Sequence, residues 1–409
     1  MHSATARTAF LISLAALLCG LAFIGPRIPI DTHRYHTEGI KLWQWFHFNA
    51  GGPPVTVREF TVLYAVAILI IAGGYGLLGG LLPATFVVAN IVLFALAVAM
   101  CFKTAELMRP GGVPLVAGLA LVFADPDLAV WSYYVLFDVP LVAILAALWW
   151  CMARAVLHDS RRDWLLGLVL AGVSALVRPT GIVAVAFWFA AAAYTYSKKR
   201  GVSRWTRTAA FVLVPTAGAL LVWPYFVYRE IVANGGSALF PQVFEELFRY
   251  YRVGAIICDR VETYLGPPQT YGDVVRINVL RVLAYFYPLR QGYSTAHNIA
   301  AGLYVACLGI LAARGAARLW RSGPRQATLA SLVLVFAAYF GLFHSMTYVD
   351  YDWRYQLPWV LAAIPLAMNG VIAPTTSQRF AWFFHPNPFG RLSQSPTFAA
   401  SVTAHKLEG

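Results

Sequence analysis

The 409-residue chain is too apolar for an ordinary water-exposed surface. Hydrophobic residues make up 59% of it, charged residues 12%, and the mean hydropathy is +0.64. This composition excludes a typical soluble domain and indicates a membrane protein with several spans. A formal net charge of +13 raises the question of nucleic acid. The cations punctuate apolar runs, however, which makes them topology signals rather than a nucleic-acid-binding stripe.

Apolar runs suited to membrane helices follow one another along most of the chain. The first follows a start that carries only Arg7 and ends at Gly25-Pro26-Arg27 without a small-residue cleavage pattern, so we expect an uncleaved helix. Crossing a ~30 Å hydrocarbon core takes about 20 helical residues, so shorter runs must be extended, tilted or re-entrant. The pattern predicts an all-α, polytopic transmembrane helix bundle of about 10–11 segments. The runs are residues 9–25, 60–82, 84–102, 113–124, 135–153, 164–177, 181–196, 209–228, 299–313, 327–343 and 357–373.

Three basic clusters set the expected orientation, because Lys and Arg accumulate in short cytoplasmic loops. With all three clusters inside, residues 164–196 form a hairpin whose outer tip is Arg178-Pro179-Thr180-Gly181. Residues 26–59, 229–298 and 344–356 then become outer loops. The clusters are Arg161-Arg162; Lys198-Lys199-Arg200 with Arg204 and Arg207; and Arg314, Arg318, Arg321 and Arg325.

The chain reads as one membrane domain, residues 1–373, followed by a polar cytoplasmic tail, residues 374–409. An outward first loop and an outward Asp138 require an even number of crossings between them, yet three apolar runs lie there. We expect residues 113–124 to be a half-membrane element, with the Gly-rich run 60–82 as the alternative. The aromatic stretches 239–251 and 274–287 predict amphipathic helices on the outer bilayer surface.

The outer end of the first helix offers a candidate general base. Asp31 begins a polar run that contains His33, Tyr35 and His36 and starts about five residues after that helix. A positioned Asp can remove a proton from a hydroxyl near neutral pH. The alternative is a solvated loop acid that caps a helix starting near His33.

Arg178 lies between two apolar runs, where a charge is costly unless it faces a cavity or a partner. Pro179 and Gly181 break the helix beside it and leave backbone donors next to the guanidinium, which suits a phosphate. The alternative is a tight turn whose arginine snorkels to lipid headgroups.

Two further stretches supply acids and cations at the ends of apolar runs. Asp352, Arg354 and Tyr355 precede Leu357-Pro358 and could hold a sugar and a phosphate, or could form an aromatic belt with a local ion pair. Asp138 opens an apolar helix, where it suits an acceptor pocket or simply the helix dipole. Arg58 lies before the second apolar run. Like Asp138, it could belong to a binding pocket or have only a structural role at the end of a helix.

The sequence gives little sign of the common motifs for metal and nucleotide chemistry. It contains no HExxH, P-loop or GxSxG pattern, and its GxGxxG match, Gly74 to Gly79, lies inside the apolar run 60–82. His33 and His36 could share a helical face but lack a third ligand, so we predict no metal site. The five cysteines lie far apart and predict neither a disulfide framework nor a CxxC site.

The order of these landmarks resembles the GT-C glycosyltransferases that use polyprenyl-phosphate sugars, a group that includes protein O-mannosyltransferases, aminoarabinose transferases and bacterial mannosyltransferases. The resemblance spans about residues 9–370. Many relatives carry paired acids where this chain has Asp31-Thr32, so dependence on a divalent metal stays open, with His33, Arg34 or Arg58 as the alternative positive charge. The matching motifs are Asp31 with Tyr35; Tyr133 to Pro140; Gly167 to Gly181, ending Ala-Leu-Val-Arg-Pro-Thr-Gly; and Arg354-Tyr355-Gln356-Leu357-Pro358.

The resemblance implies sugar transfer from a polyprenyl phosphate to the hydroxyl of a glycan, lipid or protein, on the outer side of a bacterial inner membrane. Asp31 would be the base, and Arg178, Arg354 and Arg58 would bind the donor phosphate. His33, Tyr35, Asp138, Asp352 and Tyr355 would line the donor and acceptor pocket. Direct displacement would invert the anomeric carbon. A lipid-linked glycan polymerase or ligase is the first alternative. A transporter or flippase, which should show paired charges at mid-membrane and internal repeats, is the second.

Overall fold

The computed structural model describes residues 3–28, 30–48, 64–108, 113–125, 127–233, 245–258, 260–287, 293–347 and 356–371. Every element in these residues is helical, and strand-like pairing is confined to two isolated bridges. The all-α prediction is therefore confirmed. Residues Met1–Val371 form one compact unit, and the second unit, Ile372–Gly409, lies outside the described residues. All five cysteines are free.

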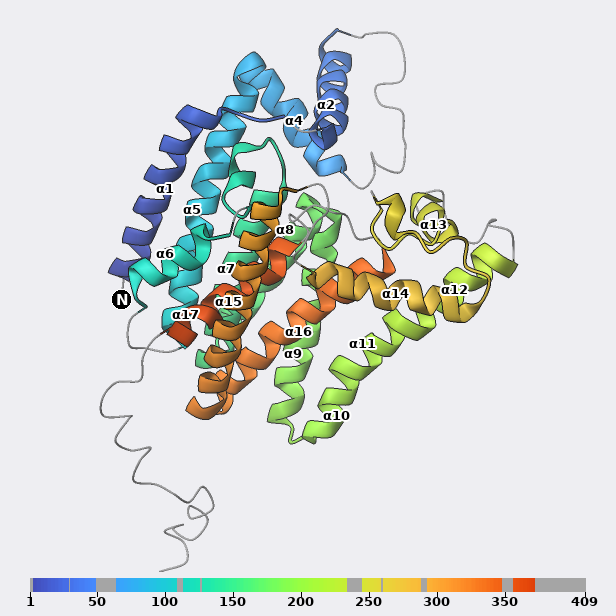
Figure 1. The fold of residues 1–409 in the computed structure, drawn as a ribbon. Coiled ribbons are helices and arrows are strands. Elements are labelled where there is room, and N and C mark those ends of the chain that lie inside the picture. The colour runs from blue at the N-terminus through green and yellow to red at the C-terminus, as the bar shows by residue number, and fades with distance from the viewer. Residues whose placement is uncertain are drawn as a thin grey trace, which may run out of the picture. The chain divides into compact units, whose positions relative to one another are not determined.

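Seven helical runs of the described residues are long and apolar enough to cross a membrane, which confirms an integral membrane protein. They are Ala4–Ile24, Ala65–Met108, Asp138–His158, Pro179–Lys199, Trp205–Ile231, Thr295–Ser322 and Pro324–Met346. The helices drawn in Figure 1 are α1 (Ala4–Ile24), α2 (Ile30–Phe48), α4 (Ala65–Leu78), α5 (Leu82–Met108), α6 (Leu115–Phe123), α7 (Asp138–His158), α8 (Arg161–Val177), α9 (Ile182–Lys199), α10 (Arg204–Thr208), α11 (Val214–Ala217), α12 (Trp223–Tyr228), α13 (Glu245–Arg252), α14 (Tyr271–Phe286), α15 (Thr295–Ser322), α16 (Pro324–Met346) and α17 (Leu357–Val371).

Several helices begin at a side chain that caps the first turn. The hydroxyl of Ser3 accepts the Ala6 N–H at 3.0 Å, Ser160 does the same for Asp163, and Ser294 for His297. Thr270 and Asp273 form a reciprocal capping box at the start of α14. Each cap satisfies a backbone donor that the helix itself leaves open. These caps fix where the helices leave the flanking polar segments.

The pairing of α1 with α5 fixes the direction of the first spans. Ser3 at the start of α1 donates to Glu106 near the end of α5 at 2.9 Å, so the two helices are antiparallel (Figure 1). Arg27, just after α1, forms a bridge with Tyr134, just before α7. The starts of α5 and α7 therefore lie at the same end of the unit as the end of α1.

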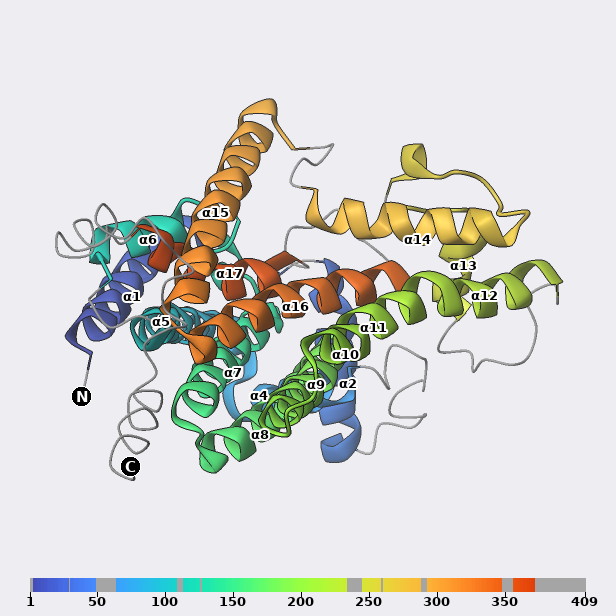
Figure 2. The same cartoon turned by 90° about the horizontal axis from the view of Figure 1, so that it is seen from below.

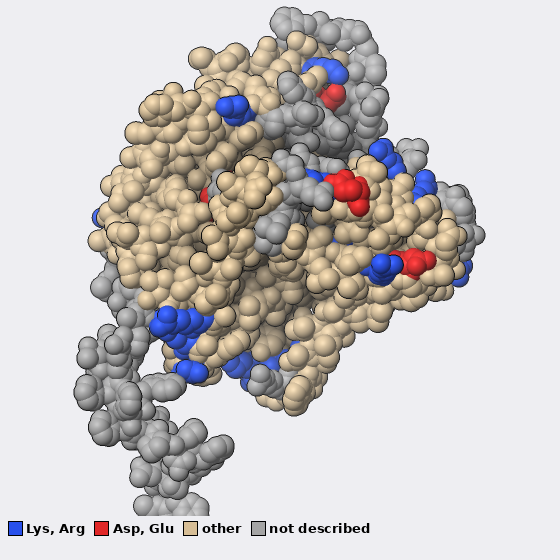
Figure 3. Space-filling view, viewed as in Figure 1, with Lys and Arg blue, Asp and Glu red and all other residues tan. Residues whose placement is uncertain are grey.

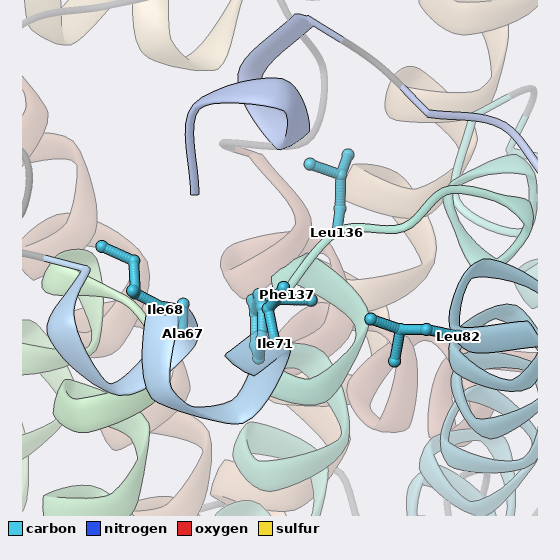
Figure 4. Close-up of a cluster of buried hydrophobic side chains, with 6 residues drawn as sticks. All are labelled: Ala67, Ile68, Ile71, Leu82, Leu136 and Phe137. Atoms are coloured by element: carbon cyan, nitrogen blue, oxygen red, sulfur yellow. The ribbon is translucent and has the colours of Figure 1, made fainter. Parts of the chain in front are cut away.

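This arrangement favours the alternative location for the element that does not cross. The helices α5 and α7 run in the same direction, so the segment between them, which contains α6, must bring the chain back to the end where α5 began. The nine residues of α6 span only about 14 Å of that distance. The helix α4 instead packs against Leu136 and Phe137, which precede α7 (Figure 4). Together α4 and α5 make one candidate span, Ala65–Met108. Residues 60–82 thus contain a helix that stays at one end, while the nine-residue α6, within residues 113–124, is too short to cross the membrane alone and is not among the candidate spans.

The run from Arg204 to Ala233 is a continuous helix with three π-helical stretches. Pro215 and Pro224 remove backbone donors inside it, which leaves carbonyls to be satisfied by other groups. Side chains of neighbouring helices do this. Tyr339 donates to the Phe211 carbonyl at 3.3 Å, Asn278 to that of Ala219 at 3.1 Å and Tyr271 to that of Leu221 at 2.8 Å.

Helices do form in both stretches that we predicted to be amphipathic. The helices α13 and α14 contribute Phe248, Tyr251, Val274 and Ile277 to a buried cluster with Val227 of α12. Figure 1 shows that α14 runs across the direction of α9, and Figure 2 shows it beside α12. This orientation is consistent with the interfacial location that the sequence predicts.

The core of the unit is α17, in which every residue from Leu357 to Gly370 is buried. Its neighbour α15 approaches so closely that a Cβ at Gly315 would lie 1.9 Å from the Leu366 carbonyl oxygen. Asn369 donates to the Ala105 carbonyl of α5 at 3.2 Å, and Arg318 caps the last carbonyls of α17. These contacts tie α17 to both sides of the bundle.

The charges on the surface agree with the predicted orientation. The lower edge of the face in Figure 3 shows Lys and Arg without Asp or Glu, whereas both signs appear higher up. Cysteine labelling in intact cells tests this directly. We expect a membrane-impermeant maleimide to label Thr180→Cys, at the tip between α8 and α9, from outside. Lys199→Cys, at the other end of α9, should stay unlabelled until the membrane is permeabilised. The reverse labelling pattern would show that the protein has the opposite orientation in the membrane.

Candidate functional site

The bridge between Arg27 and Tyr134 brings two predicted site segments together. The Arg27 N–H donates to the Tyr133 carbonyl at 2.8 Å, and the Val135 N–H donates to the Arg27 carbonyl at 2.9 Å. Asp31 is four residues beyond Arg27, and Asp138 is three beyond Val135. The start of α2 and the start of α7 therefore lie at one end of the unit. The backbones of Asp31, His33 and Tyr35 belong to α2, but their side chains lie outside the described part of the structure.

Asp138 and Arg178 form a buried ion pair. Asp138 is the first residue of α7, and its carboxylate contacts the Nη1 atom of Arg178. The side chains are only 5% and 7% exposed. Asn90 of α5 donates to the Tyr134 and Leu136 carbonyls at 2.8 and 3.1 Å, which fixes the backbone leading to Asp138. The sequence predicts separate roles for the two residues, whereas the structure makes them one unit.

The turn that carries Arg178 is tight, as in the alternative interpretation of the sequence, but the guanidinium is buried rather than extended to lipid headgroups. The Arg178 N–H donates to the Ser174 carbonyl at 3.1 Å, and the Gly181 N–H donates to the Arg178 carbonyl at 2.8 Å. A Cβ at Gly181 would lie 2.1 Å from the Ser174 carbonyl oxygen, so a larger residue does not fit without a shift of backbone. The Ser174 hydroxyl also donates to the Gly181 carbonyl at 3.1 Å. The hairpin therefore fixes the backbone at Arg178, and the ion pair with Asp138 positions the guanidinium.

A hydrophobic cluster, drawn in Figure 4, contacts the first outer helix, α2, and residues next to this ion pair. Its buried members come from α4, the start of α5 and the residues just before α7. Leu42 of α2 and Val177, next to Arg178, pack against it. The helix that contains Asp31 and both residues of the ion pair are thus tied to one cluster. The buried members are Ala67, Ile68, Ile71, Leu82, Leu136 and Phe137.

The other predicted site residues, Arg58, Asp352, Arg354 and Tyr355, lie outside the described residues. The structure does describe Thr347 and Gln356, on either side of the stretch with Arg354. Arg281 of α14 donates to the Thr347 carbonyl at 2.8 Å. Gln356 donates to the carbonyl of Tyr287, just after α14, at 3.3 Å. Both flanks are therefore held near the end of α14.

Arg281 is a buried cation in a stretch whose sequence predicts only an amphipathic surface helix. Its side chain is fully buried over the ring of Tyr251, 4.0 Å from the centroid, and its Nε donates to the Ala255 carbonyl at 2.9 Å. The Tyr251 hydroxyl meets the Ser345 and Met346 carbonyls at 3.0 and 3.1 Å. A cation at the C-terminus of α16 offsets the negative end of the helix dipole. Arg281 thus has a structural role.

A second polar cluster was missed altogether. Asp125 and Asp127 follow α6, and Asp127 Oδ2 lies 3.1 Å from Nε2 of His297 in the first turn of α15. The imidazole stacks on Tyr293 with a centroid separation of 4.3 Å. The signal available in the sequence was a pair of acids, two residues apart, between two strongly apolar runs.

Burial strongly affects the acids of this cluster. It raises the pKa of Asp125 from 3.8 to about 6, although hydrogen bonds from the Asp127 and Leu128 N–H groups act in the opposite direction. Burial also raises the pKa of Asp127, against a lowering effect of His297. Both acids are harder to ionise than in water because the charged form loses solvation.

We expect Asp125→Asn to become more stable relative to the wild type as the pH rises. The folded protein holds the Asp125 proton more tightly than the unfolded chain does, so this group reduces wild-type stability as the pH rises from about 4 to about 6. Above that range the penalty stays constant. The melting temperatures of the two proteins in detergent, compared at about pH 4 and pH 8, check this. A difference that does not change with pH would contradict the assignment.

Among the residues that the structure describes, no three or more His, Cys, Asp or Glu side chains are arranged to hold a metal ion. The comparisons with known proteins add no family. No family model matches the chain, and neither does any curated protein or solved structure.

Proposed function

We propose that the protein is a membrane glycosyltransferase that moves a sugar from a polyprenyl-phosphate donor to an acceptor hydroxyl on the extracytoplasmic side. The observation that supports this most is the convergence of three predicted motifs at one end of the unit. The bridge at Arg27 joins the segments of Asp31 and Asp138, and the ion pair joins Asp138 to Arg178. In the sequence these residues are widely separated.

The chemistry divides among these residues as follows. The Asp31 carboxylate removes the proton of the acceptor hydroxyl, and the oxygen attacks the anomeric carbon. The bond from that carbon to the phosphate oxygen breaks, and its electron pair stays on the polyprenyl phosphate. Because one displacement occurs, the anomeric configuration is inverted.

Arg178 stabilises the negative charge that grows on the leaving phosphate, and Arg354 and Arg58 complete the phosphate site. A preorganised cation at such a position is a large contribution to rate in many enzymes. Asp138 orients the guanidinium of Arg178 through the buried ion pair. The rigid turn at Gly181 keeps that orientation while the donor binds.

The location of the described buried ion pair supports a transferase over a transporter. Asp138 is the first residue of α7 and Arg178 ends α8, so the pair lies at the ends of the helices. A transporter is expected to place such pairs near mid-membrane.

The test uses the full chain in lipid nanodiscs with a panel of radiolabelled polyprenyl-phosphate sugars and a mixture of hydroxylated acceptors. We expect at least one lipid-linked sugar to be consumed with release of polyprenyl phosphate, and no consumption of nucleotide sugars. The Asp31→Asn variant is the negative control. If folded protein consumes no lipid-linked donor in nanodiscs but moves one intact across the bilayer of sealed vesicles, the transferase proposal is wrong and a flippase replaces it.

A further inference from the structure

The cluster of Asp125, Asp127 and His297, which we call the acidic cluster, has no role in the proposed transfer reaction. One oxygen of Asp125 accepts the N–H groups of Asp127 and Leu128 at 2.8 and 2.9 Å. Its other oxygen, Oδ2, is buried and has no hydrogen-bond partner among the residues that the structure describes. The whole residue is only 3% exposed. A buried carboxylate oxygen without a donor is costly, so a hydrogen-bond donor placed at Oδ2 would be favourable.

The charge of the acidic cluster is also unbalanced. Within the described chain, neither acid has a Lys or Arg within 4.0 Å, and the only ion-pair partner is His297. The groups that face Asp125 are Asp127 on its own segment and His297 and Tyr304 on α15. The Tyr304 hydroxyl donates to the Leu121 carbonyl at 3.0 Å. Above the pKa of Asp125 the cluster therefore carries excess negative charge in a chain that is basic overall.

The acidic cluster is open on one side. The side chains of Asp127 and His297 are 12% and 22% exposed, while Asp125 lies behind them. A ligand from solution can thus contact the outer two side chains. The acidic cluster also lies at the end of the unit that contains the Arg27 bridge. Asp127 precedes Tyr134 of that bridge by only seven residues, and His297 belongs to the first turn of α15.

We propose that the acidic cluster binds a protonated primary amine. An ammonium group supplies one positive charge and three compact donors, which suit the two carboxylates and the imidazole. A metal ion is the other way to balance two carboxylates, but the described side chains do not form a metal-holding group. The amine comes either from the headgroup of phosphatidylethanolamine or from an amino sugar.

The experiment measures amine binding to the full-length protein without any glycosyl donor, by calorimetric titration at about pH 7, above the pKa of Asp125 and below that of the probe's amine. The probe is glucosamine, and glucose is the matched probe without the amine. In nanodiscs of phosphatidylcholine, whose headgroup is cationic but has no N–H donors, we expect glucosamine to bind and glucose not to bind. Loss of a charge-assisted hydrogen bond weakens binding by about 10- to 150-fold. Asp125→Asn and Asp127→Asn should each show a loss in that range.

A control variant separates amine binding at the acidic cluster from binding to acidic groups elsewhere on the surface. Asp159→Asn removes an exposed acid that pairs with Lys199 and should bind glucosamine like the wild type. Both cluster variants keep an oxygen that can accept backbone N–H groups, so the turn after α6 should form. If Asp125→Asn nevertheless fails to fold, Asp127→Asn carries the test. Binding should also weaken as the pH falls through about 6, because Asp125 becomes neutral.

A second set of nanodiscs distinguishes the two sources of the amine. If added phosphatidylethanolamine competes with glucosamine, the natural occupant is a lipid headgroup; if it does not compete, the occupant is an amino sugar. Equal binding of glucose and glucosamine, or unchanged binding in both cluster variants, would overturn the proposal. Because no donor is present, failure here leaves the proposed transferase activity untouched.

Discussion

Asp31→Asn should reduce turnover of a polyprenyl-phosphate sugar by about 10²–10⁴-fold, which corresponds to roughly 3–5 kcal/mol of barrier. Asn has nearly the same size as Asp but cannot accept the proton of the acceptor. The substitution lies at the second residue of α2, where a carboxylate also interacts favourably with the helix dipole. Losing that interaction costs only about 0.3–1 kcal/mol of stability. Single-turnover kinetics with a radiolabelled donor would measure the loss.

The control for this prediction is donor binding, which should survive in Asp31→Asn because the phosphate contacts remain. Expression and melting temperature should also stay close to those of the wild type. Substantial turnover by well-folded Asp31→Asn protein would remove Asp31 as the base. The acids of the candidate pocket, Asp138 and Asp352, would then be tested in the same way.

Arg178→Ala should destabilise the protein by about 3–5 kcal/mol, because it leaves the Asp138 carboxylate buried without its partner. From the sequence alone, the same substitution is expected to weaken donor binding more than folding. The ion pair changes this expectation, since loss of either residue strands a charge. Denaturation in mixed micelles, followed by tryptophan fluorescence, measures the difference in stability.

A double-mutant cycle isolates the ion pair from other effects. Asp138→Asn combined with Arg178→Met removes both charges and keeps similar volumes, so we expect it to recover much of the lost stability. Donor use should not recover, because the guanidinium is still missing. Arg178→Ala protein as stable as the wild type would show that the pair is not a structural element. Recovery of donor use in the double variant would exclude Arg178 from the phosphate site.

Helix positions were largely predictable because hydropathy marks what the bilayer can accommodate. The run 135–153 was found as Asp138–His158, and 299–313 as Thr295–Ser322. The second difference is instructive. The helix α15 extends through Arg314, Arg318 and Arg321, since basic residues suit a helix C-terminus and reach the aqueous boundary. Hydropathy registers only the apolar part of such a helix.

The helix α2 was harder to predict because its composition is mixed. The sequence suggested at most a helix beginning near His33 inside an outer loop, whereas α2 extends from Ile30 to Phe48. Its stability comes from packing, since Gly39 lies against Ile71 of α4 and Gly76 lies against Trp43. No local pattern in residues 30–48 predicts those contacts.

The candidate site was predictable as a set of motifs but not as an arrangement. Asp138 and Arg178 were each recognised as charges at the ends of apolar runs, yet nothing in the sequence links one to the other. Their pairing depends on how α7 and α8 pack and on the turn at Gly181. Asp127 and His297 were missed for the same reason, because 170 positions separate the two partners.

The buried position of α17 has a consequence for how this protein is made. Membrane proteins enter the bilayer from the N-terminus onward, so every other described helix is synthesised before α17. With 15 residues and an internal Pro365, α17 is shorter than the roughly 20 residues that cross a bilayer unaided. Its insertion therefore relies on helices already in place, which must stay loosely associated until it arrives. Insertion of α17 is thus a late step that completes the packing of the bundle. A chain that stops before Leu357 lacks this central helix, and cellular quality control can degrade it.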